Sequence, residues 1–152
     1  MARGGGLVLN ISPKADGTIP QDQKNVLLEI GKWLEVNGEA IYGTRPWKEY
    51  GEGPTVLKPG RHGGVTDADG YTPNDIRYTT KGKSLYAISL GCADVGQKLT
   101  MALPSPSDMD IKSITMLGSE NKVDWEWAQE DLIVTMPYSK VEKMAVVFKM
   151  EL

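Results

Sequence analysis

The sequence predicts a mainly β fold, an antiparallel Greek-key β-sandwich preceded by one strand-helix unit. This prediction rests on a change in the spacing of apolar residues along the chain. Apolar residues recur at helical spacing between Thr18 and Asn37, whereas from Asp75 onward they recur at every second residue. Turn-forming residues separate the alternating segments at intervals of roughly eight to fifteen residues, which is typical of antiparallel sandwiches. The second half of the chain should therefore form two packed sheets of half-buried strands.

The helix is specified at both ends and along one face. Thr18 and Gln21 form a capping-box pair and Pro20 falls in the first turn, so the helix should begin near Thr18. Asn37 and Gly38 tolerate the left-handed conformation that commonly ends a helix. Apolar side chains recur on one face, at Val26, Leu27, Ile30, Trp33 and Leu34. This amphipathic face should be buried against another element.

The segments on either side of the helix differ in character. Leu7 to Ile11 is a short apolar run, typical of a strand covered on both faces in a parallel sheet. Glu39 to Trp47 has too many apolar groups for a solvent-exposed loop and too much glycine and proline for a regular element, so it should be a packed connector. Gly51 to Asn74 is rich in both residues and should be a long loop.

Most of the chain resembles a known enzyme family. Three stretches, Gly4 to Pro13, Asp16 to Pro20 and Ile30 to Trp47, hold five blocks, GG, LVLNISP, DGTIP, IGKWL and NGEAIYGTRPW. In this order and with these gaps they resemble the end of the catalytic domain of family 29 α-L-fucosidases. Three later blocks, DIRYT from Asp75, GKSLYAI from Gly82 and LIVTMP from Leu132, resemble that family's C-terminal β domain.

The resemblance implies a domain division and a substrate class. Residues 1–47 would be the last βα unit of a (β/α)8-like barrel with its connector, residues 48–74 the long loop, and residues 75–152 the sandwich. Catalytic groups of such barrels lie at the carboxyl ends of strands, which would place Asn10 near the rim of the active site. A structural role for Asn10 is favoured over a sugar contact. The intact enzyme would act on fucosylated glycans and be periplasmic or secreted.

The catalytic groups of that family are missing from this sequence. Retaining glycoside hydrolysis needs two carboxyl groups about 5 Å apart. In the resembled family both lie upstream of the strand matched by Leu7 to Ile11, and neither motif occurs here. We therefore assign no catalytic residue, metal site or cofactor, and the hypothesis is that this polypeptide alone is inert. Without a barrel, the helix face at Val26, Ile30 and Trp33 should be exposed, which predicts self-association or a rearranged docking of the helix on the sandwich.

A competing interpretation is a carbohydrate-binding β-sandwich module. Trp125 and Trp127 lie two residues apart and so on one face of a strand. On an exposed face these indoles could stack on sugar rings. Val123 shares that face, however, and favours the sandwich interior, because large aromatic side chains contribute so much buried area.

Composition narrows the remaining classes of partner. The formal charge of −3 in 152 residues, without a basic run, argues against nucleic acid. No apolar run reaches the roughly 18 residues of a membrane span, and Leu7 to Leu9 is too short for a signal sequence. Cys92 is the single cysteine and excludes an internal disulfide. Asp67 to Gly70 is a turn rather than a calcium loop, and His62, the only histidine, has no ligand-spaced partner.

Overall fold

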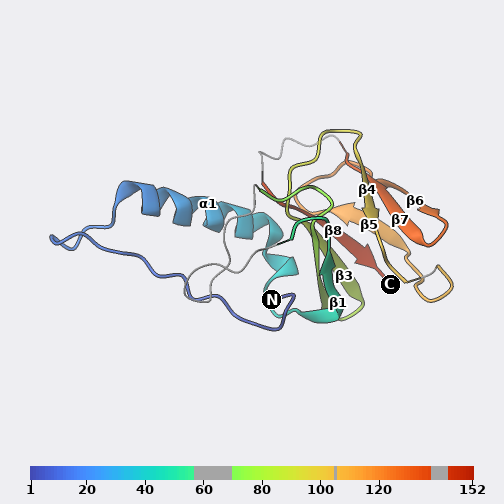
Figure 1. The fold of residues 1–152 in the computed structure, drawn as a ribbon, viewed down its shortest axis with the longest axis horizontal. Coiled ribbons are helices and arrows are strands. Elements are labelled where there is room, and N and C mark those ends of the chain that lie inside the picture. The colour runs from blue at the N-terminus through green and yellow to red at the C-terminus, as the bar shows by residue number, and fades with distance from the viewer. Residues whose placement is uncertain (57–69, 105, 138–143) are drawn as a thin grey trace.

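The computed structural model describes residues 1–56, 70–104, 106–137 and 144–152. Within these ranges the chain forms one α-helix, one short 3-10 helix (η1) and eight β-strands (Figure 1). The elements are α1 (Gln21–Asn37), η1 (Gly38–Ala40), β1 (Arg45–Glu52), β2 (Ile76–Lys81), β3 (Ser84–Ser89), β4 (Lys98–Met101), β5 (Ser113–Met116), β6 (Asp124–Ala128), β7 (Asp131–Thr135) and β8 (Val146–Glu151).

The strands form two antiparallel sheets, as the alternating pattern predicts. One sheet has five strands in the order β1-β2-β3-β8-β5, and the other has three in the order β4-β7-β6. The main core contains side chains from both sheets, among them Tyr78, Leu85, Leu99, Leu132, Val134 and Phe148. These positions are the apolar half of each alternating strand, so the mainly β sandwich is confirmed.

The central strand β3 is more deeply buried than the predicted half-buried strands. All six of its residues are buried, because a second apolar cluster covers the outer face of the five-stranded sheet. The buried members of this cluster are Ala40, Tyr86, Ile88 and Val147, with Trp33, Ile41, Leu90, Leu117 and Ala145 packed at its edge. The end of α1 and η1 therefore supply the cover that makes β3 a two-sided core strand.

Both ends of α1 differ in detail from the predicted caps. The helix begins at Gln21 and no side chain caps it, because the Thr18 hydroxyl donates to Asp16 Oδ1 at 2.7 Å instead. The Thr18 hydroxyl forms part of the turn at Asp16 and is therefore not used in the predicted capping box. At the other end Asn37 is the last residue, as predicted, but Gly38 is right-handed with φ of −60°. Space favours glycine there, since a Cβ would lie 2.9 Å from the Tyr42 ring and would push that exposed ring aside.

Two backbone predictions are wrong. Residues 7–11 form no strand in this chain, and Leu7 and Val8 are 79% and 88% exposed. A parallel strand needs neighbours to accept its backbone hydrogen bonds, and the described residues supply none at this position. The predicted connector and the predicted loop from residue 48, in turn, share a regular element, because β1 runs from Arg45 to Glu52. Proline is tolerated there because β1 is an edge strand of its sheet.

The helix extends away from the sandwich. In Figure 1 only its C-terminal end reaches the strands, while the N-terminal segment runs out to the far tip of the molecule and returns beside it. The predicted alternative of a helix laid along the sandwich is therefore not the arrangement in this structure. We call residues 1–36 the N-terminal arm.

Candidate functional site

The junction between α1 and the sandwich is the first candidate site. Trp33 donates its indole N–H to the Ala145 carbonyl at 2.7 Å, and the Thr79 hydroxyl donates to the Ala40 carbonyl at 2.7 Å. A Cβ on Gly118 would lie 2.4 Å from Val36 Cγ1, so the turn after β5 sits directly against the helix. Apolar packing and hydrogen bonds together fix the direction in which α1 leaves the sheet.

Glu39 adds a charged contact to this junction. Its Oε1 accepts a hydrogen bond from the Tyr86 hydroxyl at 2.6 Å and pairs with Lys149 Nζ at 2.6 Å. Lys149 also pairs with Glu151 at 3.2 Å. The hydrogen bonds from Lys149 and Tyr86 lower the pKa of Glu39, and the same contact with Glu39 raises the pKa of Lys149. Sequence reasoning missed this group, because nothing in the pattern places residue 39 beside residues 86 and 149.

The apolar face of α1 is only partly covered by the described residues, with Leu27, Trp33 and Leu34 half-buried. Val26 is 53% and Ile30 39% exposed, and Leu28 and Val36 are also exposed. Leu7, Val8, Leu9 and Ile11 add an exposed apolar segment, and Ser12 N–H ties its end to Gln23 Oε1 at 2.9 Å. The predicted exposed face needs one correction: Trp33 is half-buried, since the second apolar cluster and the Ala145 carbonyl hold it.

The two predicted sugar-binding indoles lie on β6. Trp125 and Trp127 are half-buried and pack against the main core, while Asp124 and Glu126, which alternate with them along the strand, are exposed. Val123 is buried with them. This placement agrees with the interior interpretation of the tryptophan face. Asn10, the third candidate, is exposed in the N-terminal arm, which lies toward the opposite end of the molecule from β6 (Figure 1).

Among the described residues, three carboxyl groups have a shifted pKa, and in each the pKa is lowered. Thr18 hydrogen bonds lower the pKa of Asp16, as Lys149 lowers that of Glu39. Burial alone would raise the pKa of Asp75, but hydrogen bonds from Thr55 and Thr72 outweigh it and lower this pKa too. A general acid of glycoside hydrolysis needs the opposite, a raised pKa.

Asp75 is the most extensively bonded of these carboxylates. It is fully buried at the start of β2 and accepts four hydrogen bonds, from the backbone N–H and the hydroxyl of both Thr55 and Thr72. These two threonines lie on either side of residues 57–69. The carboxylate therefore joins the two chain ends that enter and leave that segment.

Two further features of the described ranges bear on function. The described residues contain no group of three or more His, Cys, Asp or Glu that could hold a metal ion. No helix among them is long and apolar enough to cross a membrane. His62, Asp67 and Asp69, weighed above as ligands, lie outside the described residues.

Comparison with known proteins identifies both parts of the chain. Residues 1–39 match the α-L-fucosidase family model, and residues 69–151 match the model of the α-L-fucosidase C-terminal domain. The tissue α-L-fucosidase of Rattus norvegicus is 33% identical over 135 residues, 88% of this chain and 25% of that protein. The α-L-fucosidase of Branchiostoma floridae is 37% identical over 122 residues, 80% of this chain and 22% of that protein.

A solved structure gives the same answer. The α-fucosidase of Thermotoga maritima, crystallised with a mechanism-based inhibitor, superposes with a TM-score of 0.72 at 26% identity. The match covers 97% of this chain and 30% of that one. The chain spans about a quarter of the length of the curated relatives cited above. These matches favour a fucosidase C-terminal region over a generic carbohydrate-binding module, and the chain belongs to the α-L-fucosidase family.

Proposed function

We propose that this chain is the supporting, non-catalytic C-terminal part of an α-L-fucosidase-type glycoside hydrolase. Residues 1–44 would complete a catalytic barrel, and β1 together with residues 75–152 would support it, with residues 53–74 between them. The family match over residues 1–39 and 69–151 supports this division. The intact enzyme would hydrolyse α-L-fucosides of fucosylated glycans with retention, using carboxylates outside this sequence, and Asn10 would lie at the rim of its active site.

The observation that carries the proposal is the contrast between the two ends of α1. Its C-terminal end is fixed to the sandwich through Trp33 and the Glu39 contacts, whereas its apolar face at Val26 and Ile30 is exposed. Burying each such side chain contributes roughly 1.5–3 kcal/mol. A helix held rigidly at one end and left apolar along its face suits a second body of protein that packs on it.

A chimera tests this proposal. The region of the rat tissue α-L-fucosidase that this chain matches is replaced by residues 1–152, and hydrolysis of an aryl α-L-fucoside is measured beside the chain alone. We expect turnover by the chimera and none by the chain. Turnover by the chain alone would overturn the proposal, because it would require a carboxylate pair within these residues.

Paired variants of the chimera show whether α1 provides the docking face. Val26→Asp places a charge in the proposed interface and should abolish turnover or folding of the chimera. Glu29→Gln changes an exposed polar residue of the same helix and should leave turnover unchanged. Equal loss in both variants would contradict docking through the apolar face.

A further inference from the structure

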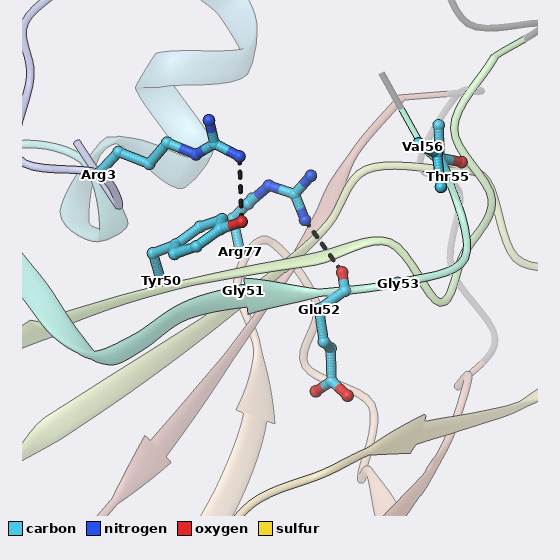
Figure 2. Close-up of a pocket in the computed structure, with 8 residues that line it drawn as sticks. All are labelled: Arg3, Tyr50, Gly51, Glu52, Gly53, Thr55, Val56 and Arg77. Carbon is cyan, nitrogen blue, oxygen red and sulfur yellow. Dashed lines mark hydrogen bonds between the residues drawn. The ribbon is translucent and has the colours of Figure 1, made fainter. Parts of the chain in front are cut away.

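An open pocket of about 460 Å³ lies between the N-terminal arm and the end of β1. Four segments line it: Arg3, then Tyr50, Gly51 and Glu52 of β1 with Gly53 after the strand, then Thr55 and Val56, and Arg77 of β2 (Figure 2). The proposed supporting role makes no use of this pocket. Its volume is within the range of small-ligand sites, roughly 300–1,000 Å³.

Two guanidinium groups line the pocket, and each is held by other groups of the chain. Arg77 Nη1 donates to the carbonyls of Glu52 and Ile76, at 3.0 and 2.8 Å. Arg3 Nη2 donates to the Tyr50 hydroxyl at 3.1 Å, and its guanidinium carbon lies 4.4 Å from the centroid of that ring. Both cations line the same pocket and lie toward the hydroxyl end of Tyr50 in Figure 2.

No carboxylate neutralises these cations within the described ranges. Neither Arg3 nor Arg77 has an ion-pair partner there. The one acidic side chain of the lining, Glu52, points away from both in Figure 2. Its carboxylate instead accepts hydrogen bonds from the Tyr78 hydroxyl and the Ala102 N–H. The pocket thus combines two positive charges with a phenol hydroxyl.

Gly51 makes this arrangement possible. The pairing of β1 with β2 shifts register between Pro46 and Gly51, where the edge strand bulges. A Cβ at residue 51 would lie 2.3 Å from the Ile76 carbonyl oxygen and 2.7 Å from Arg77 Cδ. Any other residue would therefore displace the Arg77 side chain from its place across β1.

We propose that this pocket binds a small ligand through an oxyanion, the carboxylate or sulfate group of an acidic sugar-sized molecule. Guanidinium groups bind such oxyanions through paired, charge-assisted hydrogen bonds. Because the Tyr50 hydroxyl accepts its hydrogen bond from Arg3, its own proton is free to be donated to the ligand. The remaining volume takes the body of the ligand, beside Val56 and the glycines of β1.

Calorimetric titration of the full chain tests the proposal at constant ionic strength. Sodium sulfate and sodium glucuronate are the two probes, with sodium chloride as the reference. Saturable binding of glucuronate alone would assign a planar carboxylate, and binding of sulfate alone a tetrahedral group. Binding of neither probe would overturn the proposal.

Variants locate the binding in this pocket. Arg3→Gln and Arg77→Gln should each weaken binding about tenfold or more, the effect of losing a hydrogen bond to a charged group. Gly51→Ala should weaken it by displacing Arg77. Lys98→Gln is the matched control, because it removes an exposed cation from the other sheet and should change nothing.

Folding of each variant is checked by circular dichroism. Arg77 also joins β1 to β2, so its replacement could unfold the edge of the sheet. Arg3 is exposed in the arm, so Arg3→Gln should stay folded. If Arg77→Gln unfolds, Arg3→Gln alone tests whether the pocket binds the probe. Equal weakening by Arg3→Gln and Lys98→Gln would overturn the pocket assignment, since only general charge would then matter.

Discussion

The N-terminal arm and the sandwich show two ways in which one chain uses apolar residues. In the sandwich the apolar side chains of the strands meet in a core, and Tyr78, Leu99 and Phe148 are almost completely buried. In the arm, Leu7, Val8 and Val26 remain exposed. The sandwich therefore holds its own stabilising contacts, whereas apolar side chains of the arm are left without cover among the described residues. Four variants test this difference, in order of decreasing expected effect.

Phe148→Ala should have the largest effect. Phe148 lies in the main core on β8, and truncating a buried phenylalanine costs about 3–5 kcal/mol of the free energy of unfolding. Urea denaturation followed by circular dichroism measures this. Leu28→Ala in the exposed part of α1 is the control and should cost about 0.5 kcal/mol or less. Similar costs for both variants would show that the arm contributes as much stability as the core.

Asp75→Ala should come next. The change leaves two backbone N–H groups and two hydroxyls of Thr55 and Thr72 without their acceptor, which should cost about 3 kcal/mol. Thermal unfolding measures the loss. Because the folded pKa of Asp75 is lowered, its contribution is present above the usual value of 3.8 and is lost as pH falls below it. A pH profile of the variant identical to that of the parent chain would contradict this role.

Val26→Asp should break self-association of the isolated chain. Two copies that cover the exposed apolar faces of each other would lose this contact once a charge enters it, with about a tenfold or larger weakening. Sedimentation equilibrium measures the association, and Ile30→Asp should act in the same way. Glu29→Gln is the control on the polar side. A parent chain that stays monomeric at high concentration would refute the self-association expectation.

Glu39→Gln should have the smallest effect. Glu39 is partly exposed, so solvent screens its pairing with Lys149 and the loss should be about 0.5–1 kcal/mol. The folded pKa of Glu39 is lowered, so the parent chain should lose this stability as pH falls below its usual value of 4.5. The variant should lose less over that range. Heat denaturation between neutral and acid pH compares the two, and parallel curves would exclude an electrostatic role for Glu39.

The two-residue period of apolar side chains predicted the sandwich, because a strand buried on one face alternates apolar and polar residues. Strands β4 to β7 follow that rule, β3 is buried on both faces, and the helix ends at Asn37 as predicted. β1 escaped prediction because Pro46 and Gly51 weaken a strand pattern, and here they occupy an edge and a bulge. Residues 7–11 form no strand because a parallel strand needs neighbouring strands, and the part of the chain that the structure describes places none beside them.

The sites were harder to predict than the fold. The junction joins Trp33 and Glu39 to partners more than forty residues away, and no local pattern encodes such contacts. Arg77 falls on the polar side of an alternating strand, where a charged residue ordinarily signals a solvated face. Arg77 can line the pocket because residue 51 is a glycine, which leaves room for the arginine side chain. Only the assembled backbone shows that relation.

The Asp75 hydrogen bonds have a consequence for engineering and for sequence divergence. The Asp75 carboxylate binds both Thr55 and Thr72, so these two points of the chain are held together next to β2. The entropic cost of joining two fixed chain ends rises slowly with the number of residues between them, by about 0.6 kcal/mol for each doubling. This position is therefore suited to accept inserted peptides, such as an epitope tag or a grafted recognition loop, while the sheets beneath keep their register.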